Sequence, residues 1–209
     1  MDFYTSDEFK KFINAVKQCA INAEKESNIY EWNFYVFFSI AFYTGLRKGE
    51  IHALQWNDLD NDFNHLSVKR SLNQKVKGVD VETPPKNNSS YRTLQIPLPL
   101  QNILKEHFER HKSIDGFTKS HRICGGTTPL RDTTIQLRNK MYSDLANVKT
   151  IRIHDFRHSH ASLLANRGIN IQEIARRLGH AKIEITWNTY SHLYPHEEEK
   201  AIQVLNAIM

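Results

Sequence analysis

The sequence predicts an α+β fold that is mainly α-helical and contains one small three-stranded antiparallel sheet. Apolar residues recur at helical spacing in the first quarter of the chain, and again from residue 99 onward. Between these stretches, apolar and polar residues alternate in short runs, as they do in half-buried strands. Hydrophobic residues make up 40% of the 209 residues, which is enough to bury a sizeable core. We therefore expect residues 1–209 to form a single domain.

The first quarter of the chain is expected to be helical. Thr5 and Glu8 have the spacing of a capping box, and the helix that they begin should run over about residues 5–19. A strongly apolar helix is expected over about residues 29–43. A glycine soon follows and interrupts the helical pattern, so a new, short helix should begin near residue 46 and end before residue 56.

The middle of the chain is expected to supply the sheet. Three pairs of apolar residues alternate with polar neighbours and mark the strands, namely Leu66 and Val68, Val79 and Val81, and Leu94 and Ile96. A loop rich in proline and asparagine, over residues 84–88, should lie exposed before the third strand. Helical spacing then returns, and we expect helices over about residues 99–112, 131–146, 155–167, 171–178, 183–191 and 196–208. Gly168 and Gly179 stand where C-terminal helix caps are expected.

Composition narrows the classes of function. The longest apolar stretch, from Phe34 to Phe42, falls short of the ~20 residues that cross a bilayer, so we expect no membrane partner. No charged and apolar leader opens the chain, which favours a cytoplasmic protein. Cys19 and Cys124 lack the spacing of a zinc site or a disulfide framework. The net charge of +5 is compatible with a polyanionic partner such as DNA without proving one.

Four short segments contain residue types that suit phosphate chemistry. The first is residues 44–50, which read TGLRKGE. The glycine break places Arg47 at a helix start, where free backbone N–H groups and the helix dipole favour an anion. Glu50, one turn on, is suited to hold the guanidinium group in place. The competing interpretation is an exposed Arg–Glu pair on an ordinary helix, because such pairs are common and weak.

The second segment is residues 154–161, which read HDFRHSHA. His154 and Arg157 are three residues apart, so they share one face of a helix. A guanidinium fork binds two phosphate oxygens, and a nearby imidazole can donate a hydrogen bond or accept a proton. His154 and His158 also have metal-ligand spacing, but no HExxH pattern or carboxylate partner accompanies them. A solvated basic face is the remaining alternative.

The third and fourth segments are residues 178–180, which read LGH, and residues 186–192, which read TWNTYSH. Taken alone, His180 is a helix-terminal residue whose charge suits the helix dipole. Tyr190, taken alone, has the character of a half-buried core tyrosine. Only the combination of the four segments favours a catalytic site over these simpler interpretations.

Together, the four segments resemble the signature of the tyrosine recombinase family, which includes phage and conjugative-transposon integrases and bacterial chromosome-dimer resolvases. They are similar to the family's T-G-x-R-x-x-E, H-x-x-R-H-[ST]-x-A, L-G-H and T-x-x-x-Y-[ST]-H segments, in the same order and over nearly the whole chain. A fifth segment, residues 83–92, resembles the family's lysine loop, with Asn87 where the family often has threonine. Lys86 is its only lysine, but a mobile surface lysine remains an alternative, and Lys75 and Lys77 are close in sequence.

The resemblance implies the DNA breaking and rejoining fold of tyrosine recombinase catalytic domains, and a role for each matched residue. Tyr190 would attack a DNA phosphate, expel a 5′-hydroxyl and leave a 3′-phosphotyrosyl link. Arg47 and Arg157 would clamp the nonbridging oxygens. His180 would donate a hydrogen bond to that phosphate, and His154 would act as a base or an orienting donor for the tyrosine. Lys86 would be the general acid for the leaving oxygen, and Glu50 would be an orienting carboxylate.

The resemblance also implies double-stranded DNA as the partner, self-association on DNA through the C-terminal helix, and integration or excision of a mobile element. Phosphate-bond energy is kept in such a reaction, so we expect no cofactor, and two guanidinium groups make a metal ion unnecessary. Family members normally contain an N-terminal core-binding domain and often an arm-binding domain, and neither fits before Thr5. The alternatives are a non-catalytic or truncated DNA-binding remnant of an integrase and a type IB topoisomerase-like activity.

Overall fold

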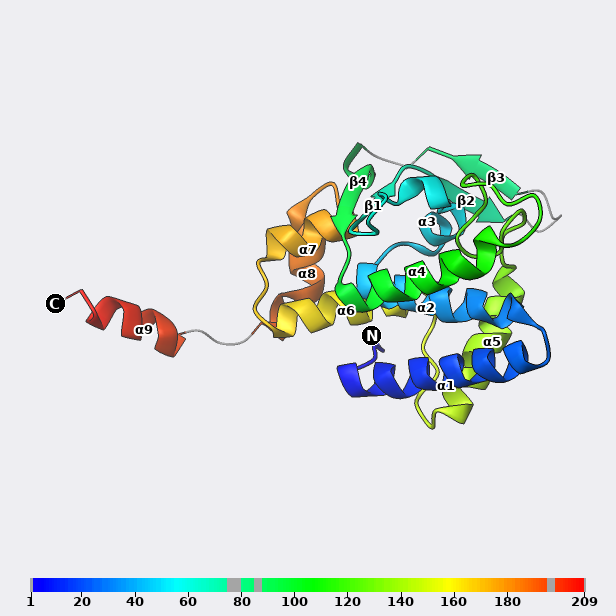
Figure 1. Cartoon of the computed structure of the whole chain (residues 1–209). Coiled ribbons are helices and arrows are strands. Elements are labelled where there is room, and N and C mark those ends of the chain that lie inside the picture. Colours follow the sequence, from blue (N-terminus) through cyan, green and yellow to red (C-terminus); the bar gives the residue numbers. More distant parts are fainter. Residues whose placement is uncertain (1, 75–79, 85–87, 195–197, 209) are drawn as a thin grey trace.

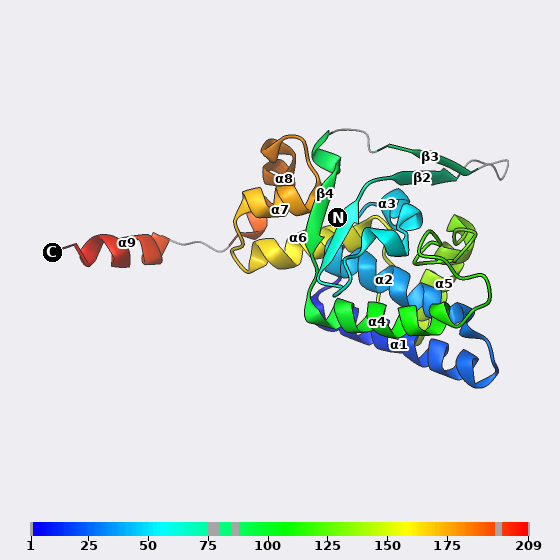
Figure 2. The ribbon, with the colours of Figure 1, turned by 45° about the horizontal axis from the view of Figure 1, so that its top comes forward.

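Helices arranged around one buried helix make up most of the molecule (Figures 1 and 2). The computed structural model describes residues 2–74, 80–84, 88–194 and 198–208. Its α-helices are α1 (Ser6–Lys25), α2 (Trp32–Thr44), α3 (Lys48–Ala53), α4 (Leu98–Lys112), α5 (Asp132–Leu145), α6 (Asp155–Asn166), α7 (Ile171–Leu178), α8 (Ile183–Tyr190) and α9 (Glu198–Asn206). Its strands are β1 (His65–Val68), β2 (Ser71–Gln74), β3 (Asp80–Thr83) and β4 (Arg92–Gln95). The mainly helical α+β class that the sequence predicts is confirmed.

The first helix begins at the capping box that the sequence predicts. The Thr5 hydroxyl accepts a hydrogen bond from the Glu8 backbone N–H at 3.2 Å, and the Glu8 carboxylate accepts one from the Thr5 N–H at 2.8 Å. The helix continues to Lys25, beyond the expected end at residue 19, and Ala20 is buried against the core on this extra length. The helix is longer than expected because its apolar face continues past Cys19 with Ala20 and Ile21, which both pack against the core.

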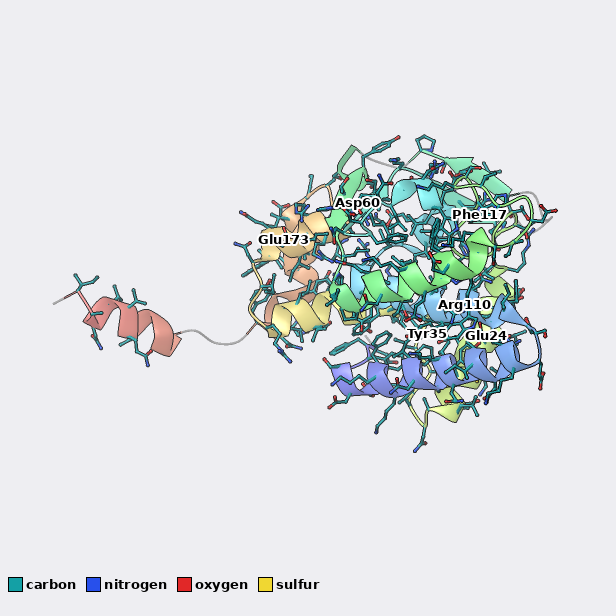
Figure 3. All side chains as sticks on the ribbon, viewed as in Figure 1. Glu24, Tyr35, Asp60, Arg110, Phe117 and Glu173 are labelled. Carbon is teal, nitrogen blue, oxygen red and sulfur yellow. The ribbon has the colours of Figure 1, made fainter. Side chains whose placement is uncertain are left out.

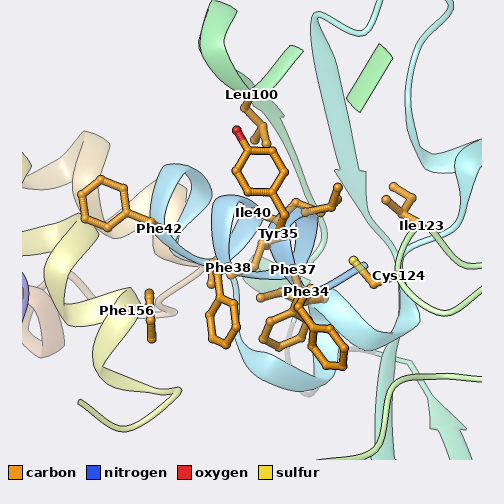
Figure 4. Packing of buried hydrophobic residues seen from close by; sticks show 14 of the residues in the cluster. Phe34, Tyr35, Phe37, Phe38, Ile40, Phe42, Leu100, Ile123, Cys124 and Phe156 are labelled. Atoms are coloured by element: carbon orange, nitrogen blue, oxygen red, sulfur yellow. The ribbon is translucent and has the colours of Figure 1, made fainter. Parts of the chain in front are cut away.

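Helix α2 is the centre of the core, and all but one of its 13 residues are buried. Phe38 packs against Phe156 of α6, with ring centroids 5.2 Å apart (Figure 4). Near the C-terminal end of α1, Arg110 of α4 donates a hydrogen bond to the carboxylate of Glu24 at 3.0 Å (Figure 3). Burial on every side explains the long apolar stretch of the sequence. None of the described helices is long and apolar enough to cross a membrane.

Among the described residues, the strands form two antiparallel pairs in place of the single three-stranded sheet that the sequence predicts. β1 pairs with β4, which places Leu66 opposite Leu94, and both side chains are buried. β2 pairs with β3 and places Leu72 opposite Glu82. The sequence does not predict β2 because Leu72 is the only apolar residue in it, so no alternation is visible.

Helices α6, α7 and α8 enclose a second, smaller core. Its buried side chains are Ala161, Ala165, Ile174, Leu178 and Tyr190. Gly45 and Gly179 end α2 and α7 in the left-handed conformation, with φ of +66° and +67°. A Cβ at Gly45 would lie 2.7 Å from the His160 side chain and 2.9 Å from that of Leu178, so glycine allows the ends of α2 and α7 to approach α6. Helix α9 extends away from both cores (Figures 1 and 2).

Candidate active site

Arg47 precedes the first turn of α3 and is held from two sides. Its backbone N–H donates to the Glu50 carboxylate at 2.9 Å, and its Nη1 group donates to the same carboxylate, also at 2.9 Å. Its Nη2 group donates to the carbonyl of Gly179 at 3.3 Å, which links α3 to the turn after α7. The Arg47 side chain remains 39% exposed. The guanidinium group is therefore fixed in place and still open to an anion from solvent.

Glu50 also forms a buried ion pair with Arg92 of β4. The Nη2 and Nη1 groups of Arg92 donate to the Glu50 oxygens at 2.8 and 3.1 Å, and the two side chains are 4% and 3% exposed. Burial alone would raise the pKa of Glu50, but the hydrogen bonds and positive charges of Arg92 and Arg47 lower it below its ordinary value. Glu50 is therefore ionised at neutral pH and balances part of the positive charge around it.

Sequence reasoning assigns no role to Arg92, although a signal is present. Arg92 is the arginine that ends residues 83–92, the segment in which the resemblance places the lysine loop. Its Nε group donates to the carbonyl of Arg177 at 2.7 Å, which ties β4 to α7. Arg92 is thus a positioning residue, because it holds the Glu50 carboxylate that in turn holds Arg47.

Replacing Glu50 by glutamine is expected to lower the free energy of unfolding by about 3–5 kcal/mol, because it leaves the buried Arg92 charge without its partner. The measurement is urea unfolding of the protein without DNA. Glu173→Gln is the matched control, since the Glu173–Arg176 pair has side chains that are 41% and 54% exposed. Its loss should stay below about 1 kcal/mol. Equal losses in the two variants would contradict the structural role of Glu50.

Arg157 is almost fully buried between two helix ends. It is 4% exposed, its Nη1 group donates to the carbonyl of Gly45 at 2.7 Å, and its Nη2 group donates to that of Leu178 at 2.7 Å. Carbonyls at helix C-termini lack intrahelical partners and concentrate negative partial charge, so they suit a guanidinium group. Burial and the nearby Arg47 charge lower the pKa of Arg157 to about 9, which leaves it charged at neutral pH.

His180 follows the same turn and is neutral. An Nη2 group of Arg157 lies 2.9 Å from its Nε2, and since arginine only donates, Nε2 must be the acceptor. The proton therefore sits on Nδ1, which donates to the Thr186 hydroxyl at 2.7 Å. Burial and the positive charges of Arg157 and Arg47 lower the pKa of His180 to about 4. His180 is thus not the charged helix-terminal residue that the LGH segment alone suggests.

Tyr190 ends α8 with its side chain in the smaller core, where it is 2% exposed. Its hydroxyl lies 2.5 Å from Nδ1 of His158. Burial raises the pKa of Tyr190 to about 12, although the charge of Arg157 acts in the opposite direction. His154 precedes α6, and its ring meets that of His158 edge to face, with centroids 4.9 Å apart. Burial and the Arg157 charge lower the pKa of His154.

The structure therefore gathers most of the residues that the sequence singles out around one turn. Arg47 and Arg157 donate to the adjacent carbonyls of Gly179 and Leu178, and His180 comes next in the chain. Lys86 lies outside the described residues, as do Lys75 and Lys77. In the part of the chain that the structure describes, no group of three or more His, Cys, Asp or Glu side chains could hold a metal ion.

The sequence also does not identify the contact between His158 and the tyrosine hydroxyl. The sequence signal for this contact is that His158 directly follows Arg157 in the second segment. Sequence reasoning considers His158 only as a metal ligand. The pair comes together because α6 and α8 pack against each other around the small core. Chemically, the site offers two guanidinium groups for an anion and a hydroxyl in contact with a neutral imidazole.

Comparison with known proteins identifies sequences similar to this one. The model of the phage integrase family matches residues 2–197. The ICEBs1 integrase of Bacillus subtilis (strain 168) is 32% identical over 215 residues, which cover 100% of this chain and 55% of the relative. A XerC-like tyrosine recombinase of Caldanaerobacter subterraneus subsp. tengcongensis is 29% identical over 231 residues, covering 99% of this chain and 54% of the relative. The chain thus spans about half the length of these curated relatives.

Solved structures share the fold. The Tn1549 transposon integrase in complex with circular intermediate DNA superposes with a TM-score of 0.75 at 18% identity, covering 100% of this chain and 67% of the other. The XerA recombinase superposes with a TM-score of 0.67 at 18% identity, covering 100% of this chain and 64% of the other. A lambda integrase dimer bound to a core site gives 0.55 at 18% identity, with 90% and 58% covered. The likeness establishes the fold of the chain.

Proposed function

The chain belongs to the phage integrase family, and on that premise we propose that it is the catalytic domain of a site-specific tyrosine recombinase. It would cleave and rejoin double-stranded DNA through a 3′-phosphotyrosyl intermediate, in the integration or excision of a mobile element. The observation that supports this most directly is the convergence of Arg47 and Arg157 on neighbouring carbonyls, at a turn whose Leu178 side chain shares a core with Tyr190.

The two arginines would bind the nonbridging oxygens of the scissile phosphate. Backbone carbonyls orient Arg157 in advance, so its charge is in place before the negative charge of the transition state develops. Arg47 is more exposed, and the Glu50 carboxylate keeps it aimed. A phosphate beside Arg157 would favour protonation of Nε2 in His180, which would then supply a third hydrogen bond to the same phosphate.

Tyr190 would attack the phosphorus and expel the 5′-oxygen of the next nucleotide. Lys86 would protonate that oxygen, because an alkoxide is a poor leaving group at neutral pH. A 5′-hydroxyl of a partner strand would later attack the phosphotyrosine and reverse the step. His154 would orient the tyrosine or assist its deprotonation. The energy of the phosphate bond is retained throughout, so the proposed reaction needs no cofactor.

Nicked suicide substrates test this proposal. Duplexes containing candidate attachment sites are incubated with the protein, and denaturing gels are read for a protein–DNA adduct. We expect the protein to be linked to the 3′-phosphate end of one fragment and the other fragment to end in a free 5′-hydroxyl. Failure on every candidate site would favour the non-catalytic remnant. Cleavage with relaxation of supercoiled DNA, but without exchange between two duplexes, would favour the topoisomerase-like alternative.

The same assay is expected to proceed in excess EDTA. Two guanidinium groups supply the positive charge that a metal ion would otherwise supply to the phosphate. The measurement is the rate of adduct formation with and without chelator, in matched buffers. Loss of cleavage in EDTA that one specific divalent ion restores would overturn the arginine clamp as the main source of charge stabilisation.

Helix α9 would join neighbouring protomers on DNA. Its apolar side chains are exposed, with Ile202 at 51%, Leu205 at 59% and Ile208 just beyond it at 75%. Removing the apolar face of an amphipathic helix from water is favourable, so an uncovered face of this kind tends to be buried against a partner. Docking on a second copy would bury it, and packing on its own domain is the alternative.

Truncation after Tyr194 is expected to weaken assembly on DNA more than it weakens folding. Leu205→Ser should reproduce much of this effect, whereas Gln203→Ser, a matched control on the same helix, should not. Assembly is measured by gel mobility of protein on a two-site duplex, and folding by the free energy of unfolding. Equal losses of assembly and stability in the truncated protein would favour packing of α9 on its own domain.

A further inference from the structure

The hydroxyl of Tyr190 has one close polar partner among the described side chains, Nδ1 of His158. The two atoms are 2.5 Å apart although their residues are 32 positions apart in sequence. A distance this short is typical of an O–H donor in a strong hydrogen bond. The pair lies between α6 and α8, which Figure 1 shows next to each other, and the tyrosine ring is anchored in the small core.

The direction of this hydrogen bond follows from acidity. A phenolic O–H is far more acidic than the N–H of a neutral imidazole, so the hydroxyl donates and Nδ1 accepts. His158 is therefore present with its proton on Nε2 and with a free electron pair aimed at the tyrosine proton. An imidazole in this tautomer, at this distance, has the geometry of a general base.

We propose that His158 is the catalytic residue that accepts the proton of the Tyr190 hydroxyl as its oxygen attacks the scissile phosphate. The inference rests on the proposed recombinase function. The O–H bond of the tyrosine breaks and an N–H bond forms at Nδ1, while the bond from the tyrosine oxygen to phosphorus forms and the bond to the 5′-oxygen breaks. The leaving oxygen takes its proton from the general acid. In the reverse step the imidazolium returns its proton to the tyrosine oxygen.

Geometry favours His158 over His154 for this step. His154 meets the ring of His158 edge to face at 4.9 Å and makes no hydrogen bond to Tyr190 in the described part of the chain. Its contact is suited to fixing the plane of the His158 ring, so that Nδ1 stays in line with the hydroxyl. His154 then fills the orienting role and His158 the proton-accepting one.

Burial and the charges around His158 keep it unprotonated, which is the form that a general base needs. It is faced by Asp155 and Arg157 on its own helix and by Arg152 and His154 just before that helix. Tyr190 on α8 and His180 after α7 also face it. Burial and the neighbouring His154 lower the pKa of His158 to about 4, and Arg157 and Arg152 act in the same direction. A DNA phosphate bound to the arginines would offset their charge and raise the basicity of His158 when the substrate is in place.

The test combines His158→Asn with a more acidic nucleophile. The asparagine side chain offers a hydrogen-bond acceptor near the position of Nδ1 but cannot take up the proton. Cleavage of a nicked suicide substrate should slow by roughly 10²–10⁴-fold, the range of general-base catalysis. Introducing 3,5-difluorotyrosine at position 190 lowers the pKa of the phenolic hydroxyl, so the nucleophile depends less on a base. This change should recover most of the rate lost in His158→Asn and should alter the rate of the wild-type protein far less.

Three controls make the outcomes distinct. Unaltered protein that forms no adduct would refute the recombinase proposal itself, whereas an active protein whose His158→Asn variant cleaves at the same rate would refute only the role of His158. A loss in His158→Asn that difluorotyrosine does not rescue would show that His158 positions the tyrosine and accepts no proton. If difluorotyrosine restored the cleavage rate of His154→Asn and not that of His158→Asn, the base would be His154. His192→Asn, which alters an exposed histidine two residues after the nucleophile, should cleave at the normal rate.

Discussion

Replacing Tyr190 by phenylalanine is expected to abolish the covalent protein–DNA adduct while DNA binding stays nearly unchanged. The substitution removes only the oxygen that would attack phosphorus, and it leaves Arg47 and Arg157, the charges that would bind the phosphate, in place. The phenylalanine ring can occupy the same position in the small core. The lost hydrogen bond to His158 should lower the free energy of unfolding by only about 0.5–1.5 kcal/mol.

Denaturing gels of a nicked substrate measure the adduct, and gel mobility at fixed salt measures binding. Tyr194→Phe is the matched control, because Tyr194 lies four residues on and its hydroxyl donates to the carbonyl of Ile169, outside the cluster around Arg157. It should keep the adduct. An adduct that persists in Tyr190→Phe would show that another residue is the nucleophile.

The second large effect is expected at Lys86. Lys86→Ala should slow cleavage by roughly 10²–10⁴-fold, a general-acid factor, while DNA affinity changes little. Expulsion of an alkoxide at neutral pH requires proton donation in the transition state, and Lys86 is the donor that we propose. Because Lys86 lies outside the described residues, this role depends on the sequence and on family membership.

A substrate with sulfur in place of the bridging 5′-oxygen separates the acid from the phosphate clamp. A thiolate leaves without a proton, so this substrate should restore the rate of Lys86→Ala. It should not restore Arg47→Ala or Arg157→Ala, since their proposed task is to stabilise charge on the nonbridging oxygens. If sulfur rescues nothing in Lys86→Ala, that lysine contacts phosphate and the acid must be sought at Lys75, Lys77 or His154.

The two rescue experiments address opposite ends of the same reaction. Difluorotyrosine removes the need for a base and leaves the need for an acid, and the sulfur substrate does the reverse. Difluorotyrosine should therefore rescue His158→Asn and not Lys86→Ala, and the sulfur substrate should rescue Lys86→Ala and not His158→Asn. A variant that both chemistries rescue, or that neither does, would have to act through the phosphate or through the fold.

Much of the fold follows from local patterns in the sequence. The capping box at Thr5 begins α1, and the helical spacing after residue 99 predicts α4 to α8 to within a few residues. The predicted left-handed cap at Gly179 is confirmed. The three expected strands are present as β1, β3 and β4, but the described strands form two antiparallel pairs in place of one three-stranded sheet. β2 is not predicted because it has a single apolar residue, and pairing depends on which strands meet in space.

By itself, the sequence determined the order of helices, the glycine breaks, and the set of residue types that could serve phosphate chemistry, because periodicity, capping and motif spacing are local properties. Only the tertiary structure decided which of these groups touch. It placed Arg92 on Glu50, 42 positions apart, and His158 on the hydroxyl of Tyr190, 32 positions apart. Such contacts arise when separate helices and strands pack around shared cores, and no spacing along the chain encodes the distance between them. The tertiary structure likewise made His180 neutral, because burial lowers its pKa and so does the guanidinium group of Arg157, which comes from α6, a different helix.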